Sequence, residues 1–346
     1  GGFGAYQITD ATVIKYADSS TSIPLSQFQS MFIGTSTATH KKVNVKVSKD
    51  RIISVELAQY VEGTISQVNT TAYEVTIRTT NGQNLVFKVP SGVVVEQQNK
   101  SNGTLSDLKI GDAVKATIPY SQDMITSIAV KKSGVYKVQV TNAVTKQVSV
   151  KDESNGALVT FTVDSMDKLY NPLKSTTAFE DMVVDEYVNA SFVGTKLEKV
   201  VIMKTNRGKV SAVDASLGTV TVQDYQNGSL LLPLGQNFTV KQANGTVSAA
   251  ITSIKPGDRI EVLQDINGKY IVHIASVSKR TVDTFDYVLN QFVLKPAAGA
   301  SKTRYSIYAK AYLHKGDQVV TASTFAADEE VTIYVLDDKI IEIEKP

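Results

Sequence analysis

Hydrophobic and polar residues alternate along most of the chain, which predicts β-strands rather than helices. An apolar pair at alternate positions returns every 72 or 73 residues and marks one strand of each period. The pairs are Val75/Ile77, Val148/Val150, Val220/Val222 and Phe292/Leu294. Asn-Gly follows three of them, and such a dipeptide favours a type I′ hairpin turn. These turns are 81–82, 155–156 and 227–228. A repeat of about 72 residues therefore organises the sequence.

Three further signals recur with this period. An acidic residue precedes a later strand in each full repeat, at Asp112, Glu186, Asp258 and Glu329. Short helical patterns come before three of these acids, at 105–108, 247–254 and 321–325. A closing strand ends each repeat, at 124–130, 197–202, 270–274 and 339–343, and 51–55 matches it one period earlier. The first sixty residues therefore read as a divergent or shortened copy.

Five or six strands in about 72 residues predict a small β-barrel or β-sandwich. We expect an all-β chain of five such tandem units in an elongated array. The predicted units are residues 1–60, 61–132, 133–205, 206–280 and 281–346. Core packing explains the strand aromatics Phe87, Phe161, Phe292 and Tyr334. A repeated fold without a repeated active site favours a scaffold over a catalyst.

The composition excludes several classes of site. Lys and Arg number 36 against 34 Asp and Glu, so no basic excess indicates a nucleic-acid partner. The chain has no Cys, which excludes disulfides and thiolate metal sites and favours a bacterial origin. No apolar run is long enough to span a membrane. The first residue is Gly1 rather than Met, and we expect a fragment whose signal or anchor lies outside it.

Candidate chemistry is sparse. His40, His273 and His314 lack metal-site spacing, and we interpret each as a surface or partly packed side chain. The sequence has no phosphate-binding loop, dinucleotide fingerprint or serine nucleophile motif, so we expect no enzyme and no cofactor. The recurrent acids fit a role in stabilising turns, with calcium at the unit junctions as the alternative.

Candidate partner contacts fall into two groups. Basic residues collect at three unit junctions and fit either exposed linkers or contacts to an anionic cell-wall polymer or a neighbouring copy. These residues are Lys131, Lys132, Lys204, Arg207, Lys279 and Arg280. The last unit holds the densest aromatic cluster, Tyr305, Tyr308 and Tyr312, which is a candidate contact for a sugar or a partner.

Two sequence patterns resemble the β repeats of S-layer and S-layer-homology-bearing cell-surface proteins of bacilli and paenibacilli. They are Gly-Thr-Ile-Ser-Gln-Val (63–68) or Gly-Lys-Val-Ser-Ala-Val (208–213), and later Leu-Lys-Ile-Gly-Asp-Ala-Val (108–114) or Ile-Lys-Pro-Gly-Asp-Arg-Ile (254–260). The resemblance implies an extracellular location at the Gram-positive cell surface and self-assembly into a lattice, with neighbouring copies as partners. The alternatives are an adhesin stalk or cell-wall polysaccharide-binding module of an exported protein, and an enzyme accessory region or cryptic hydrolase with a distant acid pair.

Overall fold

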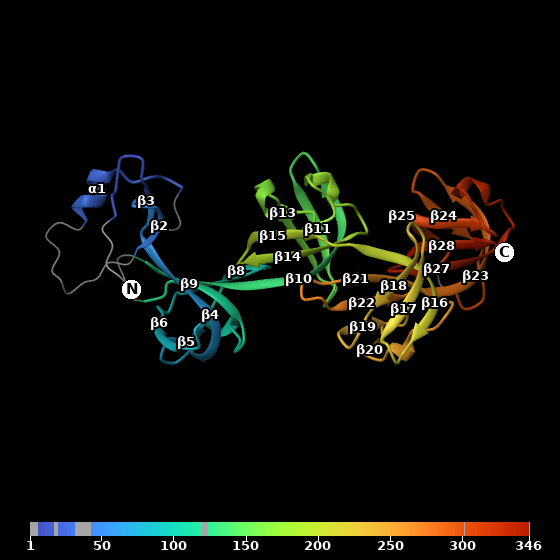
Figure 1. Cartoon of the computed structure of the whole chain (residues 1–346), viewed down its shortest axis with the longest axis horizontal. Coiled ribbons are helices and arrows are strands. Elements are labelled where there is room, and N and C mark those ends of the chain that lie inside the picture. The colour runs from blue at the N-terminus through green and yellow to red at the C-terminus, as the bar shows by residue number, and fades with distance from the viewer. Residues whose placement is uncertain (1–5, 17–19, 32–42, 120–123, 301, 346) are drawn as a thin grey trace. The chain divides into compact units, whose positions relative to one another are not determined.

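The structure is a computed structural model that describes residues 6–16, 20–31, 43–119, 124–300 and 302–345. Gly1 and His40, named above, lie outside these residues. Strands dominate the described chain, and 3₁₀ helices appear as single short turns (Figure 1). The all-β prediction is confirmed. The three short helical patterns are also confirmed as the single 3₁₀ turns η1 (Leu105–Asp107), η4 (Ile251–Ser253) and η5 (Ala322–Thr324).

The prediction of separate small barrels or sandwiches is wrong, because the strands form a β-solenoid (β-helix) of about eight turns. The residues expected to link the units are themselves strands. Four long strands cross or begin at the predicted boundaries: β4 (Ala58–Asn69), β10 (Ser127–Asn142), β16 (Thr205–Asp214) and β23 (Ser276–Asp286). A strand that continues from one repeat into the next leaves no free linker between them, and the sequence pattern alone did not reveal this continuity.

The chain divides into two compact units, each with its own core. The first comprises Gly1–Ser133 with Ala190–Lys199, and the second comprises Gly134–Asn189 with Val200–Pro346. The five predicted repeat ranges stay a prediction, and the word repeat below refers to them.

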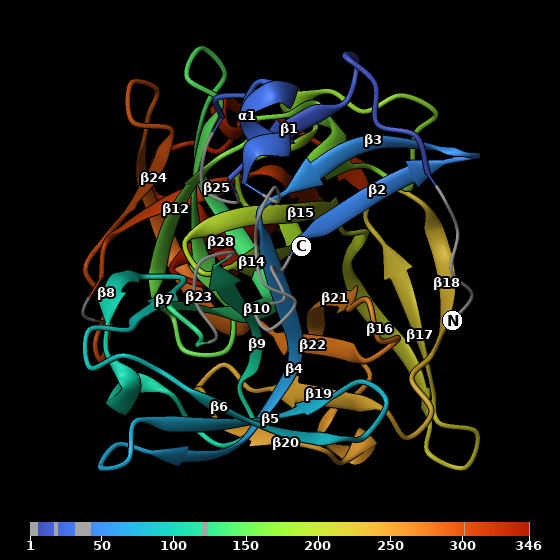
Figure 2. The same cartoon turned by 90° about the vertical axis from the view of Figure 1, so that its left-hand side faces the viewer.

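The first unit begins with a three-stranded sheet, β1 (Val13–Lys15), β3 (Arg51–Glu56) and β2 (Asn44–Ser48), covered by α1 (Leu25–Ser30). Phe28 of α1 packs with Ile14, Val55 and Leu57, and Figure 2 shows the helix beside β1. The remaining strands of this unit are β5 (Glu74–Thr79), β6 (Asn84–Lys88), β7 (Val94–Gln97), β8 (Lys100–Gly103) and β9 (Ala113–Pro119).

The second unit holds the last three repeats except Ser133 and Ala190–Lys199, which belong to the first unit. In the third repeat, the strands after β10 are β11 (Gln147–Asp152), β12 (Leu158–Thr162), β13 (Leu169–Tyr170), β14 (Tyr187–Val193) and β15 (Lys196–Ile202), with the 3₁₀ turns η2 (Met166–Lys168) and η3 (Phe179–Asp181). In the fourth, β16 is followed by β17 (Thr219–Asp224), β18 (Gly228–Pro233), β19 (Phe238–Lys241), β20 (Val247–Ser248), β21 (Arg259–Gln264) and β22 (Tyr270–Ile274).

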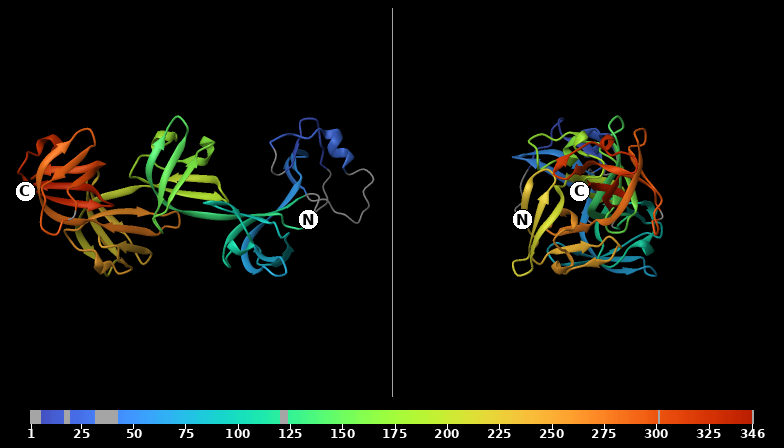
Figure 3. Two further views of the ribbon diagram at one scale, coloured as in Figure 1. Left: turned by 180° about the vertical axis from the view of Figure 1, so that it is seen from behind. Right: turned by 90° about the vertical axis from the view of Figure 1, so that its right-hand side faces the viewer.

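The fifth repeat consists of β23, β24 (Gln291–Leu294), β25 (Arg304–Lys315), β26 (Gln318–Val319), β27 (Glu330–Leu336) and β28 (Lys339–Lys345). Its sheet has the order β24-β23-β27-β28-β25-β26, and β24 also pairs with β25. The fourth-repeat sheet has the order β18-β17-β16-β21-β22-β19-β20. The strands of these two repeats lie side by side, yellow to red in Figure 3.

A parallel strand pair recurs in each repeat among otherwise antiparallel neighbours. The pairs are β1–β3, β7–β10, β13–β15, β19–β22 and β25–β28. Two parallel strands cannot be joined by a tight hairpin and need a crossover connection. This repeated crossover winds the chain.

The recurrent acid is part of a junction between two strands. A one-residue bulge interrupts β4, β10, β16 and β23 at equivalent positions. The residue before each bulge donates its backbone N–H to the carbonyl of the acid, as Ile65 does to Asp112 and Val210 to Asp258, both at 2.8 Å. Because a bulge bends its strand and increases the local twist, the junction curls the sheet in every full repeat.

The Asn-Gly turns are present, but the type I′ prediction is wrong. A type I′ turn needs positive φ at both central residues. Among these pairs only the glycines have it, with φ of 84° at Gly82, 75° at Gly156 and 73° at Gly228. Gly82 N–H donates to the Thr79 carbonyl, and Thr79 N–H donates to Gln83. The first turn is therefore a type I turn closed by a left-handed glycine, the three-residue hairpin loop with a bulge.

The predicted core aromatics are confirmed. Phe161, Phe292 and Tyr334 are buried, and Phe87 packs partly buried against the second-repeat core. The second, fourth and fifth repeats each have their own apolar cluster around the alternating pair that defines the period.

Candidate functional site

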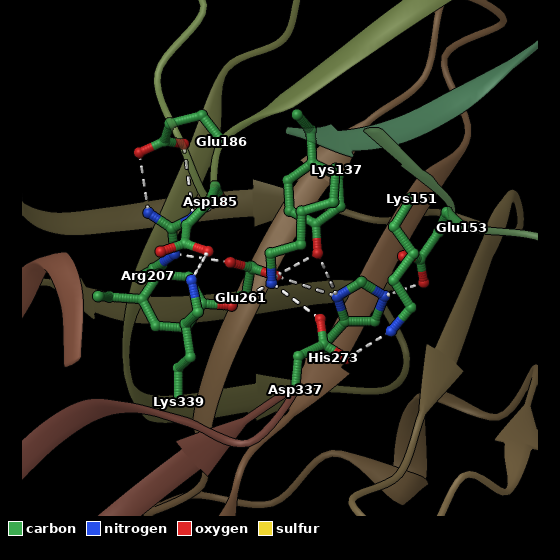
Figure 4. A network of polar contacts seen from close by, with 12 residues as sticks. Lys137, Lys151, Glu153, Asp185, Glu186, Arg207, Glu261, His273, Asp337 and Lys339 are labelled. Carbon is green, nitrogen blue, oxygen red and sulfur yellow. Dashed lines mark hydrogen bonds and ion pairs between the residues drawn. The ribbon is translucent and has the colours of Figure 1, made fainter. Parts of the chain in front are cut away.

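The most unusual feature of the second unit is a fully buried carboxylate in the middle of β21. Glu261 is 0% exposed and lies between two apolar neighbours, Ile260 and Val262. Arg207 of β16 approaches one carboxylate oxygen with its Nε at 2.6 Å, and Lys137 Nζ of β10 lies 4.0 Å from the other (Figure 4). Both cations are buried themselves. A buried charge is costly unless it is paired, and here the pairing is internal.

The strand register brings these groups together. Arg207 on β16 is the direct cross-strand partner of Glu261, and Glu261 is the direct partner of His273 on β22. Directly opposite side chains on antiparallel strands lie on one face of the sheet. The sequence thus forms a cation–anion–cation row across three adjacent strands.

His273 is held at both ring nitrogens. Its Nδ1 lies 3.2 Å from Glu261 Oε1, and its Nε2 lies 2.8 Å from Glu153 Oε1. Burial would lower the pKa of His273, but the bonds to Glu153 and Glu261 outweigh it and raise the pKa to about 9. His273 is therefore a cation at neutral pH, with an N–H to donate to each carboxylate.

The cations also fix the ionisation of the carboxylates. Burial would raise the pKa of the Glu261 carboxyl, but Lys137 and Arg207 hold it well below its usual range. Burial would likewise raise the pKa of Glu153, and its bond to His273 lowers it. Glu261 and Glu153 are thus anions at neutral pH.

Two tyrosines complete the inner layer. The Tyr187 hydroxyl donates to Glu261 Oε1 at 2.7 Å, and Lys137 bonds to the Tyr308 hydroxyl. Lys137 Nζ also lies 4.6 Å from the centre of the Tyr308 ring, and Arg207 lies 4.9 Å from it, so both make cation–π contacts. Burial and the charge of Glu261 raise the pKa of Tyr187 and of Tyr308, which keeps both hydroxyls protonated.

An outer layer of carboxylates and lysines surrounds this centre. Glu186 binds Arg207 Nη1 at 3.0 Å, and Asp337 binds Lys137 at 2.8 Å. Lys339 binds Asp185 at 2.6 Å. We call these residues together with Lys137, Glu153, Tyr187, Arg207, Glu261, His273 and Tyr308 the Glu261 network.

The Glu261 network joins three consecutive repeats. Lys137, Glu153, Asp185, Glu186 and Tyr187 come from the third repeat. Arg207, Glu261 and His273 come from the fourth, and Tyr308, Asp337 and Lys339 come from the fifth. The fourth repeat therefore supplies the buried centre, and its two neighbours supply most of the surrounding partners.

A second buried carboxylate joins the fourth and fifth repeats. Glu342 of β28 is 1% exposed and accepts from Arg259 Nε at 2.9 Å and Nη2 at 2.7 Å. Tyr225 and His314 also bind it, His314 at 3.1 Å through Nε2. The Tyr312 ring stacks between Tyr225 and His314. Two independent charge centres thus connect the same pair of repeats.

The geometry of the Glu261 network suits holding charge rather than transferring protons. A general base needs a free lone pair within reach of substrate, and protonated His273 has none. The cleft beside it, lined by Lys241, His273 and Asp337, has a volume of about 100 Å³, below the roughly 300–1,000 Å³ of ligand sites. Within the described ranges, no group of three or more His, Cys, Asp or Glu residues could hold a metal ion.

The nine residues predicted to contact partners are placed very differently. Lys204 and Lys279 are exposed, and Lys131 and Lys132 are partly exposed. Lys131 forms an ion pair with Glu62 at 2.6 Å. Tyr305 packs partly buried against the fifth-repeat core, and Tyr312 is the partly buried ring of the stack above. Partner contact through these six side chains stays a prediction.

Three of the nine are buried, and partner contact through them also stays a prediction. Arg207 is 8% exposed, Arg280 4% and Tyr308 2%. Arg207 and Tyr308 belong to the Glu261 network, so they connect repeats of this chain instead of lying on an exposed junction. The reason is that the expected linkers are strands, whose alternate side chains turn inward.

The turn-stabilising interpretation of the recurrent acids is confirmed at three positions. The side chains of Asp112, Asp258 and Glu329 each accept the backbone N–H of the residue three positions earlier, at 2.8, 2.8 and 3.2 Å. Glu186 instead binds Arg207.

Sequence reasoning missed Glu261, Glu342 and Lys137, and interpreted His273 and His314 as surface or partly packed. Both histidines are buried beside carboxylates, His273 at 6% and His314 at 7% exposure. A usable signal was present. Glu261 and Glu342 are single acids inside otherwise apolar runs, 260–263 and 340–343.

No family model matches the chain, and no curated protein matches it either. In the part of the chain that the structure describes, no helix is long and apolar enough to cross a membrane.

Proposed function

We propose that this chain is a structural segment of a bacterial cell-surface protein, a self-assembling component of an S-layer or a wall-associated scaffold. The observation that carries the proposal is the Glu261 network, which connects three consecutive repeats through buried charges. A segment that transmits load or holds a lattice spacing needs repeats that do not rotate against one another.

Buried ion pairs suit this task because they are directional. Apolar surfaces can slide over one another at small cost, whereas breaking a buried pair by removing one partner costs about 3–5 kcal/mol. A rotation of the fifth repeat that removed Asp337 would break the 2.8 Å ion pair of Lys137 and leave Glu261, 4.0 Å away, to balance its charge. The network therefore favours one arrangement of the last three repeats over its alternatives.

The same features support a non-catalytic role. Glu261, Lys137 and Arg207 are strongly perturbed ionisable groups of the network, and such groups often mark active sites. Here each one is shielded from solvent and satisfied by a partner within the chain. Structural ion-pair networks perturb pKa values in the same way.

Electron microscopy tests the assembly proposal. The protein, produced with any sequence that naturally flanks residues 1–346, is imaged with and without calcium. We expect ordered two-dimensional sheets in at least one condition. Discrete particles in both conditions would contradict self-assembly and favour the adhesin stalk or polysaccharide-binding module instead.

A variant links the assembly to the network. Glu261→Gln removes the buried charge with little change of volume, and Glu74→Gln removes a partly exposed carboxylate of the second repeat that pairs with Lys88. We expect disordered or absent sheets only with Glu261→Gln. Sheets of unchanged order in that variant would separate the network from the scaffold function.

A further inference from the structure

Arg280 differs from the other buried arginines. Of the arginines that the structure describes, Arg207, Arg259 and Arg280 are buried. Arg207 is paired with Glu261, and Arg259 with Glu342. Among the described residues, no carboxylate lies within 4.0 Å of the Arg280 guanidinium. Strand β23 therefore carries a buried cation without an anionic partner among the described residues.

The contacts of Arg280 are backbone carbonyls. Both Nη atoms donate to the Lys302 carbonyl at 3.1 Å, and Nη2 also donates to the Lys295 carbonyl at 3.1 Å. Its Nε is buried and has no hydrogen-bond partner in the described structure. Carbonyl dipoles orient a guanidinium but carry no net charge, so the charge stays uncompensated and one donor stays unused.

Arg280 lines a cleft that is large enough for a ligand. The cleft has a volume of about 430 Å³ and lies between β23, the loop after β24, and the strands β27 and β28. This volume falls within the roughly 300–1,000 Å³ of small-molecule sites. Pro296 and Ala297 supply apolar surface on one side.

The charged lining of the cleft is mainly basic. Lys279, Lys295 and Lys345 line it together with Arg280, against the single carboxylate of Glu330. Lys295 and Lys345 are already paired with Asp328 and Glu329 outside the lining. Lys279 is exposed, so Lys279 and Arg280 are the two cations with capacity for a ligand.

We propose that this cleft binds an oxyanion, a carboxylate or phosphate group carried by a free small ion or by an acidic sugar unit. Arg280, fixed by the two carbonyls, supplies the buried charge, and Lys279 supplies a mobile second charge at the edge. Glu330 opposes the ligand and limits its affinity. The proposal goes beyond the scaffold function and does not depend on it, because a single unassembled chain contains the whole cleft.

A titration of the intact chain tests the site. The ¹H–¹⁵N NMR spectrum is followed as inorganic phosphate, glucuronate or uncharged glucose is added at constant ionic strength. We expect saturable shifts at residues 279–281, 295, 297 and 330–332 with an anion but not with glucose. Saturation by phosphate alone would identify a free ion as the ligand. A preference for glucuronate would identify an acidic sugar as the ligand. The absence of saturation by both anions overturns the proposal.

Four variants locate the binding charge. Arg280→Gln should weaken binding about tenfold or more, since it removes a charged hydrogen-bond donor. Lys279→Ala should weaken it about threefold, and Glu330→Gln should strengthen it by a similar factor, because these side chains are exposed and screened. Lys204→Ala replaces an exposed junction lysine of the third repeat and should leave the affinity unchanged.

The outcomes are decisive even if Arg280→Gln fails to fold. Lys279→Ala and Glu330→Gln replace exposed side chains and should move the dissociation constant in opposite directions. Unchanged affinity in both, or an equal effect of Lys204→Ala, overturns the assignment of the cleft. The titration does not measure sheet formation, so a negative titration leaves the scaffold proposal unaffected. Likewise, a failure to form sheets in electron microscopy leaves the proposed anion site unaffected.

Discussion

The second repeat and the junction of the last three repeats share one strand pattern but differ in what fills the interior. The second-repeat core is a set of aliphatic side chains around Val75, Ile77 and Val114, and the described residues there include no buried charge. The fourth and fifth repeats have comparable apolar cores, and in addition the last three repeats bury Lys137, Glu261 and Arg207 where they meet.

This difference separates two tasks. Aliphatic side chains stabilise a repeat through the area they bury, with little dependence on direction. A buried ion pair adds little or no net stability over a hydrophobic replacement, but it disfavours every arrangement in which one partner is missing. We interpret the apolar core as the source of repeat stability and the Glu261 network as the source of repeat order.

The substitution with the largest expected effect on stability is Glu261→Gln. Lys137, Arg207 and protonated His273 then face a neutral amide, and we expect the free energy of unfolding of the second unit to fall by about 3–5 kcal/mol. Urea denaturation with hydrogen exchange of second-unit amides measures it. The matched change Glu74→Gln in the second repeat should cost less than about 1 kcal/mol, since its ion pair is partly exposed. Equal costs at the two positions would contradict a special role of the network.

A pH titration gives the next largest effect. The pKa of His273 is raised from 6.5 to about 9, so the folded state binds a proton more tightly than the unfolded state. The contribution of His273 to the stability of the folded state is complete below pH 6.5 and is lost as the pH rises through about 9. We expect a loss of about 3 kcal/mol in the second unit over this window, since one pKa unit corresponds to about 1.4 kcal/mol.

The control for the pH effect is His273→Gln. Its unfolding free energy should start lower at pH 6.5 and show a much flatter profile up to pH 9. If both proteins lose the same stability over this range, His273 is not the group that titrates. The protection factors of second-repeat amides, which surround an aliphatic core in the first unit, should change little with pH in either protein.

The apolar side of the comparison predicts a smaller effect. Ile77→Val removes one buried methylene from the second-repeat core and should cost about 1 kcal/mol at every pH. Chemical denaturation at pH 6.5 and 9 checks both statements. A cost that varied with pH would mean that charges outside the aliphatic cluster contribute to this core.

Local features of the fold could be read from the sequence, while the charge centre could not. The alternating pairs, the 3₁₀ turns and the turn acids depend on residues a few positions apart, so their patterns stay visible in one chain. The Glu261 network depends on strand register and on partners such as Glu153 and His273, which are 120 residues apart. No spacing rule connects such residues before the sheet is known.

The unexpected burial of Arg207 and Arg280 has the same origin. The basic junction segments 204–207 and 279–280 read as exposed linkers in the sequence, because charged residues are usually exposed. Strand alternation instead turns Arg207 and Arg280 inward and leaves Lys279 outside. An arginine at a strand-like position beside an isolated acid in an apolar run, as Arg207 is beside Glu261, is the pattern that would have indicated a buried pair.

The smallest predicted effect concerns a feature that both regions share. Asp112 in the second repeat and Asp258 in the fourth each accept a backbone N–H three residues earlier at 2.8 Å. Both carboxylates are partly exposed, so Asp112→Ala and Asp258→Ala should each cost only about 0.5 kcal/mol, at the low end for a single hydrogen bond. Matched denaturation curves of the two variants measure this. Because the junction is local, the two costs should agree within error even though the interiors differ. A clearly larger cost at Asp258 would show that the turn acid of the fourth repeat also supports Arg259, its chain neighbour, and through it the charge centre at Glu342.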